Sequence, residues 1–160
     1  MGQQTPLRLE VAEVAGRRIA GIRRQGPYDR ISETFVKLFP VVESLGLAPD
    51  QVQGAEYVAV YFDDPDHTPA EQLRSLAGVT VADEAAIGEL QEQRMPPGRY
   101  ARMTFVGSHA ALGEAWTEFG RLFDEAGYER GLGASYEVYV QTDPSTSPDQ
   151  ARTDIYQAIP

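Results

Sequence analysis

The chain contains no cysteine, which excludes disulfides, thiolate catalysis and cysteine-based zinc sites together. No apolar run approaches the roughly 20 residues that a membrane helix needs. The first residues do not join a basic segment to an apolar one, and Pro6 stands where a myristoylation signal needs Ser or Thr. These absences predict a cytoplasmic protein with no membrane partner.

Basic residues are also scarce. The 160 residues include 14 Lys and Arg against 24 Asp and Glu, which gives a formal net charge of −10. Because binding to DNA or RNA depends on neutralising phosphates with Lys and Arg, direct nucleic-acid binding is disfavoured. The acidic field instead favours a cationic small molecule or a basic protein surface as partner.

Motifs for common catalytic and cofactor sites are missing too. There is no Gly-x-Ser-x-Gly elbow and no P-loop, so acyl transfer and nucleotide hydrolysis have no support. The acidic run at residues 63–67 lacks the central Gly and the oxygen spacing of a calcium loop, and a turn rich in Asp and Pro explains it. Since His67 and His109 also lack zinc-ligand spacing, we expect no metal and no cofactor.

Apolar spacing in the rest of the chain predicts strands and two helices in an order that occurs twice. The first set comprises strands at about 7–14, 17–25, 55–62 and 73–81, with a helix from residue 31 to Gly46. The second set comprises strands at about 98–106, 134–140 and 152–159, with a helix at 112–126.

The two sets align at nearly constant offsets, which indicates an internal duplication. Phe35 and Trp116 differ by 81 positions, whereas Tyr57 and Tyr136 differ by 79, an offset that pairs Val58 with Glu137. The pattern predicts one domain, residues 1–160, made of two repeats at about 7–82 and 90–160. Two such units about a pseudo-twofold axis would leave a cleft between them.

Glu137 is out of place in its strand, because the neighbouring residues are β-favouring valines and tyrosines. Alternation along a strand puts it on one face with Ser135 and Tyr139. One interpretation is a solvent-facing acid on an edge strand, and the other is a cleft carboxylate. Trp116 and Phe35 lie in apolar helix stripes, where aromatics form cores as often as pockets.

Several segments together resemble the bacterial DNA gyrase inhibitor (GyrI-like) family. Residues 57–74 carry its middle signature, and Gly26-Pro27-Tyr28, Trp116 and residues 136–139 match its other marks in order and spacing. The resemblance runs from about Val11 to Ile159. It implies an α+β fold of tandem βαββ (SHS2-type) repeats with antiparallel sheets, two main helices and a central cleft, as in the effector-binding domains of AraC- and MerR-type regulators.

The resemblance also implies a site. Its cleft binds amphipathic, often cationic, small molecules, with Glu137 as counter-ion and Trp116 facing the ligand. Tyr61 and Tyr139 are candidates for the same aromatic wall, where a tyrosine offers its ring face to a cation. Phe35, the repeat partner of Trp116, and Tyr28 complete the predicted ligand-binding residues. One departure is Gly107-Ser108-His109, which replaces the Gly-Pro-Tyr often seen at the start of the second helix and puts a tyrosine from that corner in doubt.

We therefore predict a stand-alone, cytoplasmic GyrI-like protein that binds cationic compounds, as multidrug-binding proteins do, with a role in protecting DNA gyrase from toxins. No helix-turn-helix precedes the module, so a complete transcription regulator is not expected. Two alternatives stay open. One is gyrase inhibition by protein–protein contact, and the other is hydrolysis of cyclopropane-bearing genotoxins with Glu137 as catalytic acid or base. The balance favours a binding protein over an enzyme.

Overall fold

The computed structural model describes residues 7–131, 134–140 and 147–160. These residues form two α-helices, four short 3-10 helices and eight strands. The first half contains β1 (Glu10–Val14), β2 (Arg17–Gln25), η1 (Tyr28–Arg30), α1 (Ile31–Ser44), β3 (Tyr57–Tyr61), η2 (Ala70–Gln72) and β4 (Arg74–Val81). The second half contains β5 (Gln91–Met95), β6 (Gly98–Val106), η3 (His109–Ala111), α2 (Leu112–Glu125), β7 (Ser135–Val140), η4 (Pro148–Gln150) and β8 (Arg152–Ala158).

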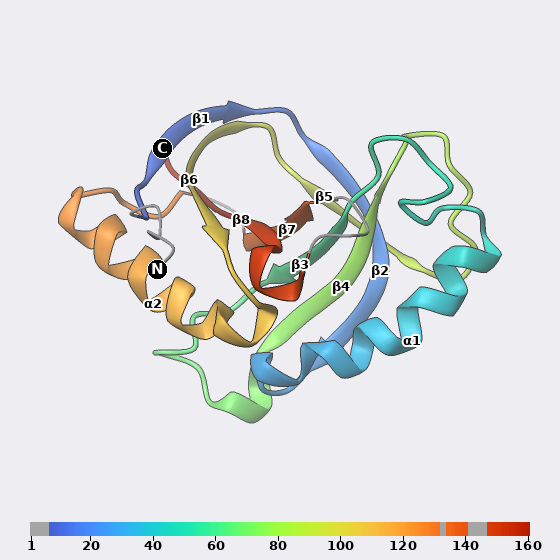
Figure 1. Cartoon of the computed structure of the whole chain (residues 1–160), viewed down its shortest axis with the longest axis horizontal. Helices are drawn as coiled ribbons and strands as arrows, with labels where there is room; N and C mark the ends of the chain where they lie inside the picture. The colour runs from blue at the N-terminus through green and yellow to red at the C-terminus, as the bar shows by residue number, and fades with distance from the viewer. Residues whose placement is uncertain (1–6, 132–133, 141–146) are drawn as a thin grey trace.

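All eight strands join one antiparallel sheet in the order β1-β6-β8-β7-β3-β4-β2-β5, which curls into a half-barrel (Figure 1). The two helices lie along the same side of the sheet, α2 beside β6 and α1 beside β2 and β4. The central pair is β3 and β7, one strand from each repeat. The predicted α+β fold with two helices and a duplicated strand pattern is confirmed.

The offset of 81 is confirmed across the first part of each repeat. It relates α1 to α2 and β2 to β6 residue by residue, from Ile31 and Leu112 to Ser44 and Glu125 in the helices. It also relates β1 to β5, a strand that the sequence analysis did not predict. Four of the five β5 residues are Gln, Glu or Arg, as suits an exposed edge strand, so they show no apolar alternation.

The offset of 79 between β3 and β7 is wrong. Ala59 pairs with Ala77 of β4, and Glu137 pairs with Ile155 of β8. Both residues of the second pair lie 78 positions after those of the first pair, so the two repeats superimpose when residue 59 corresponds to residue 137. The correct offset is 78, and Ala59, not Val58, is the counterpart of Glu137. Because a slip of one residue moves a side chain to the other face of a sheet, Val58 lies on the face opposite to Glu137, whereas Ala59 lies on the same face.

The sheet carries a core on each face. On the face with the helices, two clusters gather around the buried sides of α1 and α2. On the opposite face, Tyr100, Tyr136 and Tyr156 pack with aliphatic residues, and the Tyr136 and Tyr156 rings stack at 4.8 Å. The Arg17 guanidinium lies over both stacked rings. Glu137 pairs with Ala59, a member of the α1 cluster, and therefore lies on the helix-bearing face.

Two glycines face each other where β2 and β4 pair, Gly21 opposite Gly78. A Cβ added at Gly78 would lie 2.5 Å from Ile19 Cγ2 and 2.9 Å from the Ala20 carbonyl oxygen. One of these contacts is with the backbone, so a change of side-chain rotamer alone could not remove the clash. The curled sheet therefore requires glycine at this position.

Replacing Gly78 by Ala should lower the free energy of unfolding by about 1–3 kcal/mol, the usual cost of overpacking. Gly120, on the exposed side of α2, is the matched control because an added Cβ there meets nothing within 4 Å. Gly120→Ala should raise the stability by about 0.5–1 kcal/mol, since alanine favours a helix interior. Urea titrations of both variants measure the two effects, and an unchanged midpoint for Gly78→Ala would contradict the argument.

Candidate functional site

Glu137 is buried at the seam between the two repeats, with 2% of its surface exposed. Its oxygen Oε1 accepts hydrogen bonds from the hydroxyls of Tyr61, at 2.6 Å, and Tyr139, at 2.5 Å. Its oxygen Oε2 accepts a bond from the indole nitrogen Nε1 of Trp116, at 2.7 Å. Four of the six predicted site residues therefore meet at one carboxylate.

The sheet register explains this arrangement. Ala59 stands directly opposite Glu137, so Tyr61, two residues further along β3, is a diagonal neighbour of Glu137 on the same face. Tyr139 follows Glu137 by two residues on β7 and shares that face for the same reason. Trp116 comes from α2 and reaches the carboxylate from the helix-bearing side of the sheet.

The carboxylate has three neutral donors and no cation. None of the ion pairs among the described residues includes Glu137. An ionised carboxylate only accepts hydrogen bonds, and all three neighbours donate, so the surroundings match the charged form. Burying a charge without a counter-charge is costly, and the three donors offset part of that cost.

The two tyrosines are held as donors. Burial raises the pKa of both Tyr61 and Tyr139 well above the ordinary value, and the adjacent Glu137 charge raises each pKa further. Because folding raises these pKa values, the contribution of each tyrosine to the stability of the fold is complete below the unfolded-state pKa of about 10. It is lost only as the pH rises towards the folded-state pKa, so both hydroxyls stay protonated at neutral pH.

The second repeat carries the acid and the first does not. Ala59 replaces Glu137, and Phe35 replaces Trp116, in the first repeat. The ring contacts are otherwise alike, because Phe35 meets Tyr139 edge-on at 5.5 Å and Trp116 meets Tyr61 edge-on at 5.6 Å. An indole N–H stands only where there is a carboxylate to receive it.

The two remaining predicted positions lie one ring further out. Phe35 contacts the Tyr139 ring and has no polar group to offer to Glu137. Tyr28 packs against Tyr61 with ring centroids 4.6 Å apart, and its hydroxyl donates to the Asp63 carbonyl oxygen at 2.8 Å. In the other repeat His109 holds the position of Tyr28, and its ring lies 5.1 Å from Tyr139. The corner therefore keeps an aromatic ring although it has no tyrosine.

The aromatic rings cover the carboxylate. Trp116, Tyr61 and Tyr139 are partly exposed, whereas Glu137 is buried, so these rings separate the carboxylate from solvent. The Trp116 ring also packs on Phe119 of the α2 core, at 5.6 Å. A ligand could reach Glu137 only if at least one of these rings moved.

Three buried polar side-chain atoms in the described chain have no hydrogen-bond partner: Arg24 Nε, Ser75 Oγ and Thr153 Oγ1. Ser75 pairs with Tyr61 across the sheet, and Thr153 pairs with Tyr139, so both flank the site on the same face. Neither residue could be predicted from the sequence, because only the strand register brings them to the two tyrosines. By contrast, the acidic run makes local contacts, with Asp63 bound to Arg74 and Asp64 to His67, each at 2.8 Å, and no three potential metal ligands gather within the described ranges.

Comparison with known proteins identifies the family. The GyrI-like small molecule binding domain matches residues 9–160. The chain belongs to the GyrI-like family. The chain is 30% identical over 157 residues to a DNA gyrase inhibitor of Yersinia enterocolitica, covering 94% of this chain and 96% of the relative. It is 31% identical over 142 residues to the DNA gyrase inhibitor of Escherichia coli K12, covering 84% and 86%. The resemblance predicted from the motifs is therefore confirmed.

Solved structures agree on the fold of this GyrI-like chain. The C-terminal domain of EcmrR superimposes with a TM-score of 0.69 at 13% identity, covering 98% of this chain and 99% of that one. SAV2435, solved with tetraphenylphosphonium bound, gives 0.67 at 14% identity, covering 95% and 93%. Identities this low establish the fold alone. Neither α1 nor α2 has the length and apolar character of a membrane span, and the same holds for every helix in the described ranges.

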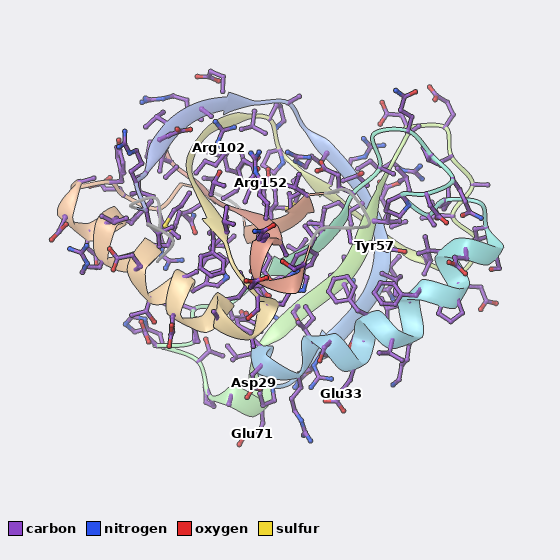
Figure 2. The ribbon with its side chains drawn as sticks, in the orientation of Figure 1. Asp29, Glu33, Tyr57, Glu71, Arg102 and Arg152 are labelled. Atoms are coloured by element: carbon purple, nitrogen blue, oxygen red, sulfur yellow. The ribbon has the colours of Figure 1, made fainter. Side chains whose placement is uncertain are left out.

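Removing a single hydroxyl tests the donor arrangement. Tyr61→Phe and Tyr139→Phe should each lower the free energy of unfolding by about 1–3 kcal/mol, because a buried carboxylate then loses a donor. Tyr57 serves as the control (Figure 2). It packs against Phe39 of α1 and makes no side-chain hydrogen bond to the described residues, so Tyr57→Phe should change stability by less than about 0.5 kcal/mol. Equal losses in all three variants, measured by urea unfolding, would refute the donor role.

Proposed function

We propose that this GyrI-like protein binds an amphipathic, cationic small molecule at the seam between its repeats. Glu137 supplies the counter-charge, and Trp116, Tyr61 and Tyr139 supply aromatic walls. The observation that carries the proposal is the buried carboxylate with neutral donors and no cationic partner among the described residues. Phe35 and Tyr28 extend the wall behind those rings.

The energetics favour a cation over a neutral ligand. Removing a carboxylate from water is costly, and the fold has already met that cost at Glu137. A positive charge brought close would recover the Coulomb attraction that water otherwise provides, and in a poorly solvated site that attraction is strong. Aromatic faces also attract cations, which adds to the preference. A neutral ligand of the same shape gains only the apolar contacts.

The site must open before it binds. Trp116 is the natural moving part because it is partly exposed and is attached to a helix rather than to the sheet. Its movement would free Oε2 of Glu137 while Tyr61 and Tyr139 still hold Oε1. It would also change the surroundings of the only tryptophan in the chain, so ligand binding should alter the intrinsic fluorescence.

Tetraphenylphosphonium is a suitable probe, since a structural neighbour of the same fold was solved with it. Triphenylphosphine oxide is a neutral analogue of similar bulk. Glu137→Gln should weaken tetraphenylphosphonium binding by about ten- to a hundredfold, the loss expected for one desolvated charge pair. The same change should leave triphenylphosphine oxide within about threefold. Isothermal titration calorimetry measures both affinities.

Glu56→Gln is the matched control, because it makes the same change of charge in a partly exposed acid that pairs with Arg17. It should leave both affinities unchanged. Equal losses for the cation and the neutral analogue in Glu137→Gln would remove the counter-ion role, and tetraphenylphosphonium binding that ignores Glu137 altogether would remove the proposed site.

Gyrase inhibition is a second candidate, favoured by the names of the curated relatives and by the acidic surface. Asp29, Glu33 and Glu71 are exposed and project along the lower edge of the view in Figure 2. Such charges could compete with DNA for a basic groove on gyrase, and the competition would weaken with added salt.

We expect the protein to inhibit gyrase supercoiling at low salt, and the combined change of Asp29, Glu33 and Glu71 to Lys to weaken the inhibition at least about fivefold. The control changes three scattered exposed acids to Lys, at Glu13, Asp50 and Asp124, and alters the net charge equally. Equal weakening by both variants would indicate a general charge effect. No inhibition at any protein concentration would exclude this function.

Hydrolysis of a cyclopropane-bearing genotoxin remains a hypothesis. Two structural neighbours from Listeria innocua are described as hydrolases, with TM-scores of 0.60 and 0.62, but identities of 10% and 9% indicate the fold alone. Glu137 would have to exchange a proton with the substrate, and both of its oxygens are engaged by donors. The geometry therefore favours binding over proton transfer.

A further inference from the structure

A basic corner lies beside the Glu137 site, where three strands of the first repeat end. β2 ends at Gln25, β3 ends at Tyr61 and β4 begins at Arg74, so side chains from both faces of the sheet converge there. The corner holds a cavity of about 280 Å³, lined by Arg23, Arg24, Gln25, Phe62, Arg74 and Ser75. Three arginines around one cavity are unusual in a chain with a net charge of −10.

Two of these arginines lack a counter-charge. Arg74 is held by both carboxylate oxygens of Asp63, at 2.8 and 3.0 Å, so its charge is balanced. Arg23 lies over the Phe62 ring at 5.7 Å, and neither Arg23 nor Arg24 forms an ion pair with any described residue. The corner therefore carries an excess of positive charge.

Two of the three unpartnered buried polar atoms are in the same place. Arg24 and Ser75 face each other across β2 and β4, and neither Arg24 Nε nor Ser75 Oγ has a hydrogen-bond partner in the described chain. Ser75 is 1% exposed. Native proteins satisfy nearly all buried polar groups, so a donor pair of this kind calls for an acceptor. A carboxylate or phosphate oxygen accepts several bonds and carries the matching charge.

We propose that this corner is an oxyanion subsite, which accepts a carboxylate or phosphate group borne by the ligand. Tyr61 links it to the main site, because Tyr61 pairs with Ser75 and donates to Glu137. Two strand spacings across and two residues along separate Ser75 from Glu137, roughly 12 Å. The preferred ligand is then a zwitterionic amphipath with its cation at Glu137 and its acid at Arg24, and the cation end of this inference rests on the proposed function.

The second repeat has no equivalent corner. At the offset of 81, Thr104, Phe105 and Val106 of β6 take the places of Arg23, Arg24 and Gln25. Thr153 keeps the position of Ser75, but Phe105 faces it where an arginine faces Ser75. The acid belongs to one repeat and the basic corner to the other. A ligand with two opposite charges would therefore bind in one orientation.

Two matched dyes test the proposal. Rhodamine 110 carries a delocalised cation and a free carboxylate, and rhodamine 123 is its methyl ester. Arg24→Gln should weaken rhodamine 110 by about tenfold, the effect of one charge-assisted hydrogen bond, and leave rhodamine 123 within about twofold. Arg8→Gln, an equal charge change at an exposed residue, should affect neither dye. Fluorescence anisotropy gives the affinities, and an equal effect of Arg24→Gln on both dyes would overturn the subsite.

A cation-free probe separates this inference from the proposed function. Phenylphosphonate should bind the wild-type protein, Arg24→Gln should abolish that binding, and Glu137→Gln should leave it intact. If Glu137→Gln changes neither dye while phenylphosphonate behaves as expected, the cation site fails and the oxyanion subsite stands. Inorganic phosphate binding as tightly as phenylphosphonate would identify a site for the free anion instead. Absence of phenylphosphonate binding up to about 50 mM, far weaker than a charge-assisted site should be, would overturn the proposal.

Should Arg24→Gln unfold, Arg24→Lys provides the same test, because it keeps the charge and removes Nε. The expected loss for rhodamine 110 is then smaller than in Arg24→Gln but still greater than for rhodamine 123. Thermal unfolding of each variant, compared with the wild type, shows whether the fold is retained.

Discussion

The structure depends on one buried carboxylate that is held only by neutral donors. Glu137 stands at the seam of two repeats, with two tyrosine hydroxyls on one oxygen and an indole N–H on the other. A well-packed apolar residue is often at least as stabilising as a buried charge, and the first repeat has the apolar Ala59 at the equivalent position. The fold therefore keeps a charge where packing alone does not need it, which is typical of a functional site.

The duplication provides an internal comparison for each residue of the site. Tyr61 and Tyr139 are equivalent positions, so the symmetric frame brings both hydroxyls to the seam irrespective of the acid. The acid and the indole are the asymmetric additions, found together in the second repeat. The equivalent positions Arg24 and Phe105 show the reverse asymmetry, because here the charged residue belongs to the first repeat. Two repeats of the same fold thus form an asymmetric site, with the acidic group on the second repeat and the basic group on the first.

Much of this was predictable from the sequence. Apolar spacing located both helices, the offset of 81 related them, and period-two alternation placed Glu137 and Tyr139 on one face. The residue-by-residue correspondence of β3 and β7 between the repeats was not predictable, because the tyrosines at 57 and 136 align at an offset of 79 whereas the strands superimpose at 78. Strand β5 was not predictable either, because its polar edge residues lack alternation. The same holds for Ser75 and Arg24, which meet only through the pairing of β2 with β4.

In the proposed function, the closed site reconciles stability with binding. Three donors hold Glu137 in a water-poor setting, so the empty protein can fold around a charge without leaving it unsatisfied. The same donors are neutral, so they leave the negative charge uncancelled. A ligand that displaces the Trp116 ring loses one hydrogen bond and gains a full Coulomb interaction at short range. Under the proposed function, a cation makes that exchange favourable, because the resting partners of Glu137 carry no charge.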